Sequence, residues 1–332
     1  MADRPRSQEL RPIAAGAVCL VAYSYLWAWW LNARGETPAV LLTVREWVNV
    51  PLGIGEDFGV LGLGLLLAVG GFVVTESTVR RGPGATAGLL AVRAGLPLVM
   101  VALLAAALVL SGARPLGVAD TGRPTPLGSV VADFGFGWVV WTGVVFCVLL
   151  GVTAPLLRGR PGVAAALHLA VLAALVVTGA DADGWYTQVG LLASFGTFPV
   201  AGAVVWCALD GRLAGWAAGL LGVGCYALLV VAEHGYPDLA GWWYPLTWMY
   251  AVGLVLLAGV RPLPCPAPVR WAAERAYALL LGMGVAGYAT LNALDGLVPW
   301  VVALLAALVV TGAVGEVVHR LVPRRQAVEV AR

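Results

Sequence analysis

Residues 58–76 read FGVLGLGLLLAVGGFVVTE, a stretch with no charged side chain before Glu76. A helix needs about 20 apolar residues to cross the hydrocarbon core of a bilayer. This stretch therefore predicts a transmembrane helix. Arg80 and Arg81 follow shortly after it, and arginine favours the cytoplasmic side of a membrane. We expect this helix to end in the cytoplasm.

Apolar runs of the same kind recur along the whole chain. They lie near residues 12–31, 94–112, 135–157, 163–179, 187–208, 213–232, 243–260, 274–292 and 298–317. The first run is too long for the core of a signal peptide and has no clear small-residue cleavage site, so it counts as a helix. The predicted fold is an all-α integral membrane protein of about ten transmembrane helices. It forms a single membrane domain over residues 1–332, with short cytoplasmic tails of about 1–11 and 319–332.

The composition excludes a soluble fold. Of the 332 residues 61% are hydrophobic and 11% are charged, whereas soluble domains carry about 25% charged residues. The mean hydropathy is +0.89. A net charge of +2 gives no indication of nucleic acid as a partner. The five cysteines form no CxxC pair, so neither a metal site nor a structural disulfide is expected.

The arginines predict the orientation. All 20 basic residues are arginine. If the N-terminus is cytoplasmic, the predicted outer segments hold only Arg34, Arg45, Arg114 and Arg123, which leaves 16 of the 20 inside. This asymmetry predicts an even number of spans and two cytoplasmic termini. The absence of lysine and the abundance of Ala, Gly and Val resemble codon bias in a GC-rich bacterium, so we expect the bacterial cytoplasmic (inner) membrane.

Three stretches carry a resemblance to a known family. Residues 62–73 read GLGLLLAVGGFV, the segment Trp138–Leu157 contains Trp141-Thr142 and Pro155, and residues 276–281 read AYALLL. In this order they resemble the G-V-D-L-F-F-V-L-S-G-F signature, the W-T…P helix and the S-Y-x-x-Y-L element of the acyltransferase 3 family. The resemblance implies a bundle of that type. It also implies transfer of an acyl group, often acetyl, from a cytoplasmic acyl-CoA to a sugar or small-molecule hydroxyl, with acyl-CoA as co-substrate and no bound cofactor.

The departures from that family concern its polar residues. An arginine of the family is kept as Arg11, but the histidine expected eleven positions later is Ala22. Alanine cannot take a proton from an acceptor hydroxyl, a task that suits imidazole. The other polar positions fall at Gly64, at Gly70, among Val145, Phe146 and Cys147, and at Met283. The chain therefore resembles a divergent member. The alternative is a catalytically silent relative that acts as a membrane binding, transport or scaffold protein.

Two histidines are candidate catalytic bases. His168 lies within the run 163–179, where it could face a central cavity or form a hydrogen bond to a neighbouring helix. His234 follows Glu233 in a predicted outer loop. A neighbouring carboxylate can raise the basicity of the ring, but Gly235, Pro237 and Asp238 are also typical of an ordinary turn.

The candidate donor site consists of Arg11, Arg80, Arg81 and Arg93. Guanidinium groups bind phosphates such as those of CoA, yet topology and anionic lipid would place the same residues there. Glu76 has the helix spacing to pair with Arg80. On the outer side, Arg45-Glu46 and Glu56-Asp57 could bind a polar acceptor or be solvated. A pore lined by imidazole would favour the enzyme, and a purely apolar pore the silent relative.

Overall fold

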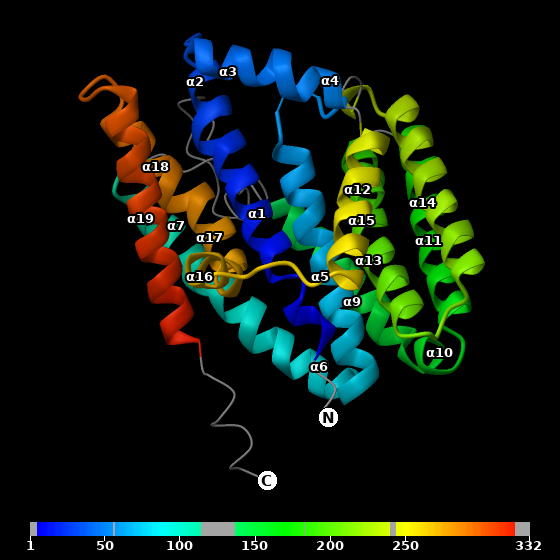
Figure 1. Cartoon of the computed structure of the whole chain (residues 1–332). Helices are drawn as coiled ribbons and strands as arrows, with labels where there is room; N and C mark the ends of the chain where they lie inside the picture. Colours follow the sequence, from blue (N-terminus) through cyan, green and yellow to red (C-terminus); the bar gives the residue numbers. More distant parts are fainter. Residues whose placement is uncertain (1–4, 56, 114–136, 183, 240–243, 323–332) are drawn as a thin grey trace. The chain divides into compact units, whose positions relative to one another are not determined.

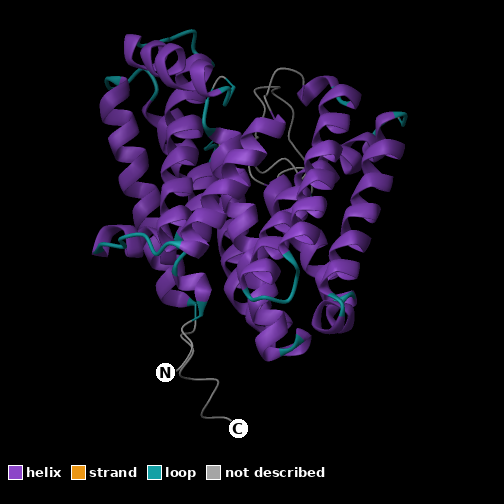
Figure 2. Ribbon diagram, turned by 45° about the vertical axis from the view of Figure 1, so that its right-hand side comes forward, coloured by secondary structure: helices purple, strands orange, loops and turns teal. Residues whose placement is uncertain are grey.

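The computed structural model describes residues 5–55, 57–113, 137–182, 184–239 and 244–322. Every regular element within these ranges is helical (Figure 2). The prediction of an all-α protein is therefore confirmed for this part of the chain. The helices fall into two compact units. The first comprises residues 1–86 and 139–273, and the second comprises residues 87–138 and 274–332.

Among the described residues, eight helical stretches are long and apolar enough to cross a membrane. They are Arg6–Asn32, Gly59–Arg81, Pro83–Leu110, Pro161–Ala180, Trp185–Leu209, Gly215–Gly235, Ala276–Leu294 and Trp300–Leu321. Two further apolar helices, α9 (Gly137–Val152) and α15 (Tyr244–Val260), have 16 and 17 residues. At about 1.5 Å per residue, 16 residues cover about 24 Å, less than the roughly 30 Å of a hydrocarbon core. The protein is a multi-pass membrane protein, and the count of ten spans stays a prediction.

The first unit contains most of the helices (Figure 1). Several stretches combine α-helix with short 3₁₀ or π-helical segments, labelled η. In chain order its elements are η1 (Arg6–Gln8), α1 (Arg11–Val21), η2 (Ala22–Trp29), α2 (Trp30–Asn32), α3 (Ala39–Val44), η3 (Arg45–Asn49), α4 (Val50–Leu52), α5 (Gly59–Arg81), α9, α10 (Ala154–Gly159), α11 (Pro161–Ala180), α12 (Trp185–Phe195), α13 (Thr197–Leu209), α14 (Gly215–Gly235), η5 (Pro237–Leu239), α15 and α16 (Ala267–Glu274), the last of which ends at the unit boundary. The helix α6 (Pro83–Leu90) leads from this unit into the second.

Helix α5 is the centre of the first unit, and its glycines let other helices approach its backbone. It packs against α1, α13 and α15. A Cβ atom added to Gly62 would lie 2.9 Å from the carbonyl oxygen of Ala17 in α1. One added to Gly71 would lie 2.6 Å from the carbonyl carbon of Pro199 in α13, and one added to Gly202 of α13 would lie 2.9 Å from the carbonyl carbon of Ala68. Small residues allow such close packing of membrane helices, where the hydrophobic effect does not drive association.

No helix was predicted between the runs 12–31 and 58–76, but the structure contains one there. The structure contains the continuous helical stretch α3–η3–α4, which runs across the ends of α2 and α5 (Figure 1). The stretch is too short to register as a membrane-spanning run, which explains why hydropathy missed it. Arg45 and Glu46 lie within it and are exposed. Trp47 is 76% exposed, and tryptophan is enriched at membrane–water interfaces.

The second unit holds six described elements. They are η4 (Ala91–Gly95), α7 (Leu96–Leu110), α17 (Ala276–Gly282), η6 (Met283–Gly287), α18 (Tyr288–Leu294) and α19 (Trp300–Leu321). Arg275, which precedes α17, is 8% exposed, and its Nε donates to Glu316 Oε2 of α19 at 2.5 Å. Arg320 Nε donates to the other carboxylate oxygen at 2.7 Å. Glu316 therefore joins α17 and α19 at one end.

We expect Gly71→Ala to destabilise the protein. The added methyl group would meet the backbone of Pro199, and backbone atoms cannot change rotamer to make room. Overpacking of this kind costs about 1–3 kcal/mol, which should lower the melting temperature of the detergent-solubilised protein. Gly70→Ala is the matched control, because a Cβ atom at Gly70 would have no atom of another helix within 4 Å. Equal melting temperatures for the two variants would contradict this packing.

Candidate functional site

Three of the four predicted donor-binding arginines lie on two neighbouring helices of the first unit. Arg11 is the first residue of α1, and Arg80 and Arg81 are the last two residues of α5. The two helices pack against each other. Arg93 lies apart from them along the chain, in η4 of the second unit, and is exposed.

Glu76 provides a buried carboxylate near the end of α5. Glu76 is 3% exposed, and its two oxygens accept hydrogen bonds from the backbone N–H groups of Arg6 and Ser7, each at 3.0 Å. Arg80 Nη2 lies 3.3 Å from Glu76 Oε1, which confirms the predicted pair. A carboxylate is a strong acceptor for backbone N–H groups. Glu76 therefore holds the start of the described N-terminal segment against α5, a contact that sequence spacing could not reveal.

The His168 side chain forms a hydrogen bond between neighbouring helices. It is 2% exposed, on α11, and its Nε2 lies 2.7 Å from Thr153 Oγ1. The Thr153 hydroxyl donates its one hydrogen to the Leu149 carbonyl, also at 2.7 Å. His168 Nε2 must therefore be the protonated nitrogen and the donor. This bond joins α11 to the junction of α9 and α10, which is the structural alternative considered above.

His234 lies in the last turn of α14, not in a loop as predicted, because the helix continues to Gly235. The end of an apolar run indicates where a helix leaves the hydrocarbon core of the bilayer. The helix itself can continue beyond that point, because its backbone hydrogen bonds do not depend on apolar side chains. The ring is exposed, and its Nδ1 donates to the Val230 carbonyl at 2.8 Å. Next to it, the Tyr236 hydroxyl donates to the Val176 carbonyl at 2.7 Å. Burial raises the pKa of Tyr236, with smaller contributions from Tyr186 and Asp181.

The two histidines do not form one site. The helices α11 and α14 pack together and run in the same direction. His168 is early in α11 and His234 is near the end of α14, a difference of twelve positions along the two helices. At 1.5 Å per residue they are offset by roughly 18 Å along the bundle. Neither is a neighbour of the other, and their catalytic roles stay predictions.

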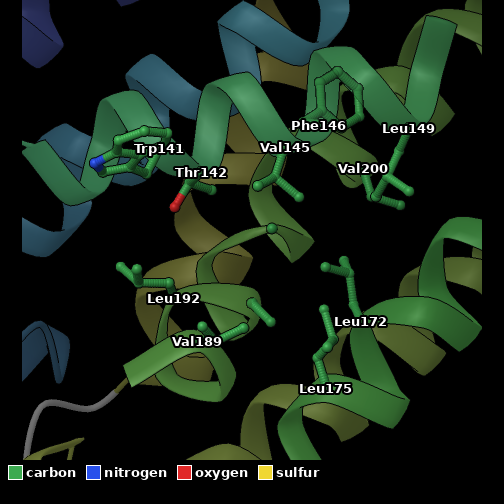
Figure 3. A pocket seen from close by; sticks show the side chains of 12 residues that line it. Trp141, Thr142, Val145, Phe146, Leu149, Leu172, Leu175, Val189, Leu192 and Val200 are labelled. Carbon is green, nitrogen blue, oxygen red and sulfur yellow. The ribbon is translucent and has the colours of Figure 1, made fainter. Parts of the chain in front are cut away.

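The first unit contains an apolar cavity of about 320 Å³ (Figure 3). It lies between α9, α11, α12 and α13. The residues that line it are Trp141, Thr142, Val145, Phe146 and Leu149 from α9, Leu172 and Leu175 from α11, Val189, Leu192 and Ala193 from α12, and Gly196 and Val200 at and after the start of α13. None of these side chains is ionisable. The cavity therefore offers apolar contact surface and no general acid or base.

The stretch that resembles the W-T…P helix forms one wall of the cavity. Trp141 and Thr142 line it, and so do Val145 and Phe146, where the resemblance would place a glutamate. Gly64, at the position of the signature aspartate, lies against Phe198: a Cβ atom there would be 2.7 Å from the ring Cδ1. At the positions of the expected glutamate and aspartate, this chain therefore has residues without a polar side chain.

The chain matches no protein-family model, no curated protein and no solved structure. The resemblance to the acyltransferase 3 family stays a prediction from the residues quoted above.

We expect Glu76→Gln to release the N-terminal segment. The amide keeps one acceptor oxygen but turns a donor towards the second backbone N–H group, and it loses the charge that pairs with Arg80. A hydrogen bond to a charged group contributes about 1.5–3 kcal/mol. Hydrogen–deuterium exchange of residues 5–10 should therefore become faster. Glu46→Gln, at an exposed position of η3, is the control. Unchanged exchange in Glu76→Gln would show that the carboxylate does not hold this segment.

Proposed function

We propose that the protein binds an acyl chain of a membrane lipid in the cavity of the first unit, without making a covalent bond. This is the binding alternative to acyl transfer. We place it in a bacterial cytoplasmic membrane with both termini in the cytoplasm, as the arginine distribution predicts. The observation that carries the proposal is the lining of the cavity, which is apolar and contains one hydroxyl, that of Thr142.

The size of the cavity suits a single hydrocarbon chain. Ligand sites generally have volumes of about 300–1,000 Å³, and about 320 Å³ is at the lower end of this range. Trp141 and Val145 line the cavity and are also 50% and 45% exposed. The cavity is therefore accessible along α9 from the apolar surroundings of the helix. A chain could enter from the bilayer without crossing water.

Filling the cavity should displace the lipid. The probe is a phosphatidylglycerol with a photoactivatable diazirine in one acyl chain, added to the purified protein in detergent. In the unmodified protein we expect cross-links to peptides of α9, α11 and α12. Val145→Trp should reduce their yield by about tenfold or more, equivalent to at least about 1.4 kcal/mol, because the indole would occupy the space between α9 and α12.

Val148→Trp is the matched control for this experiment. It introduces the same side chain on the same helix, but Val148 is 59% exposed and does not line the cavity. Cross-linking in Val148→Trp should equal that of the unmodified protein. The melting temperature of each variant shows that it is folded. If labelling is spread over the lipid-facing helices and Val145→Trp leaves it unchanged, the proposal is wrong.

Acyl transfer from a cytoplasmic acyl-CoA to a sugar or small-molecule hydroxyl is a second proposal. It is supported by the arginines at the start of α1 (Arg11) and at the end of α5 (Arg80 and Arg81), since guanidinium groups suit the phosphates of CoA.

The test of acyl transfer uses purified protein, labelled acetyl-CoA and a panel of hydroxyl acceptors. If acyl transfer is the function, the label should move to an acceptor, and His234→Ala or His168→Ala should abolish this turnover. Absence of turnover in the unmodified protein, together with cross-linking in the cavity, would favour lipid binding alone.

A further inference from the structure

Thr142 is a buried hydroxyl without a hydrogen-bond partner among the described residues. It is 4% exposed, and its Oγ1 has neither a side-chain nor a backbone partner. Figure 3 shows this oxygen directed from α9 into the cavity, on the side of Leu192. Leaving a buried polar group without a hydrogen-bond partner is unfavourable. The cavity therefore contains a buried hydroxyl with which a ligand can form a hydrogen bond.

Other threonines in helices of this protein satisfy themselves locally. Each of five donates its hydroxyl to the carbonyl four residues earlier, as helix geometry allows: Thr43, Thr86, Thr153, Thr178 and Thr290. Thr142 does not, although the same geometry applies in α9. Two further buried threonines also lack a partner, Thr75 and Thr311, but neither lines the cavity. Among the described threonines, Thr142 alone both lacks a hydrogen-bond partner and lines the cavity.

The polar group lies at one end of the cavity. On α9, Trp141 lies eight positions before Leu149 and Thr142 lies seven positions before it. Eight residues of helix span about 12 Å. In Figure 3, Trp141 and Thr142 lie towards one end, and Leu149, Leu172 and Val200 towards the other. Tryptophan prefers the membrane interface, so the Thr142 end corresponds to the level at which the polar part of a lipid begins.

We infer that the cavity takes an ester-linked acyl chain of a glycerophospholipid, with the ester carbonyl accepting a hydrogen bond from Thr142 Oγ1. The hydrocarbon then extends along α9 towards Leu149 and Leu172. A hydroxyl that has no acceptor in the protein requires one from the ligand, and an ester carbonyl provides it at the start of the chain. This inference rests on the proposed function, to which it adds the class of lipid and its orientation.

The test compares ester-linked and ether-linked phosphatidylglycerol as competitors of the diazirine probe. A dialkyl ether has the same headgroup and chains but no carbonyl. One net hydrogen bond contributes about 0.5–1.5 kcal/mol, so the ester lipid should compete about 2- to 10-fold better. Thr142→Val should abolish this preference, and Thr142→Ser should retain it.

The stability of Thr142→Val gives an independent measurement. Because the hydroxyl has no partner in the protein, its removal should leave the melting temperature of delipidated protein unchanged or raise it. A fall in melting temperature would mean that the protein itself satisfies Thr142, and would overturn the inference. Thr142→Val should therefore weaken ester-lipid binding without loss of stability, which a structural role would not produce.

The outcomes separate this inference from the proposed function. If Val145→Trp blocks cross-linking but the ester and ether lipids compete equally in the unmodified protein, lipid binding stands and the carbonyl contact is wrong. If Val145→Trp has no effect, the cavity is not the binding site and both proposals fail.

Discussion

The close approach of α5 and α13 is the constraint on which the first unit depends. Gly71 lies against the backbone of Pro199, and Gly202 against that of Ala68. In lipid, helices gain little from hiding apolar surface from water, so dense packing has to hold them together. This crossing determines the position of α13. The cavity residues Gly196 and Val200 lie beside it, so the shape of the cavity follows from contacts between two backbones.

The few charged residues hold helix ends together. Glu76 joins the N-terminal segment to α5, and in the second unit Glu316 joins Arg275 to α19. Charges are costly within a bilayer, which explains why these groups lie near the ends of their helices and bind partners there. The histidine within a span, His168, is hydrogen-bonded to Thr153. What remains for a ligand inside the first unit is an apolar space with one hydroxyl, a combination suited to hydrocarbon.

The sequence correctly predicted those features that depend on residues close together in the chain. Runs of apolar residues predict membrane helices because every backbone polar group in lipid must be satisfied within the helix, and the described helices follow those runs. The Glu76–Arg80 pair follows from helix spacing. The helical segment over Ala39–Leu52 was missed because its length is below that of a span. His234 was assigned to a loop because the run of apolar residues ends before the helix does.

The candidate site was harder to predict because one apolar helix face resembles another. The sequence by itself determined that the chain lies in a membrane as a helical protein, since composition and run length depend on the solvent and not on neighbours. Only the tertiary structure decided which faces meet. It shows that Glu76 accepts hydrogen bonds from two backbone groups about seventy residues away in sequence, and that Thr142 faces a cavity. These properties arise from the approach of distant helices, which depends on the fit of small and large side chains in three dimensions.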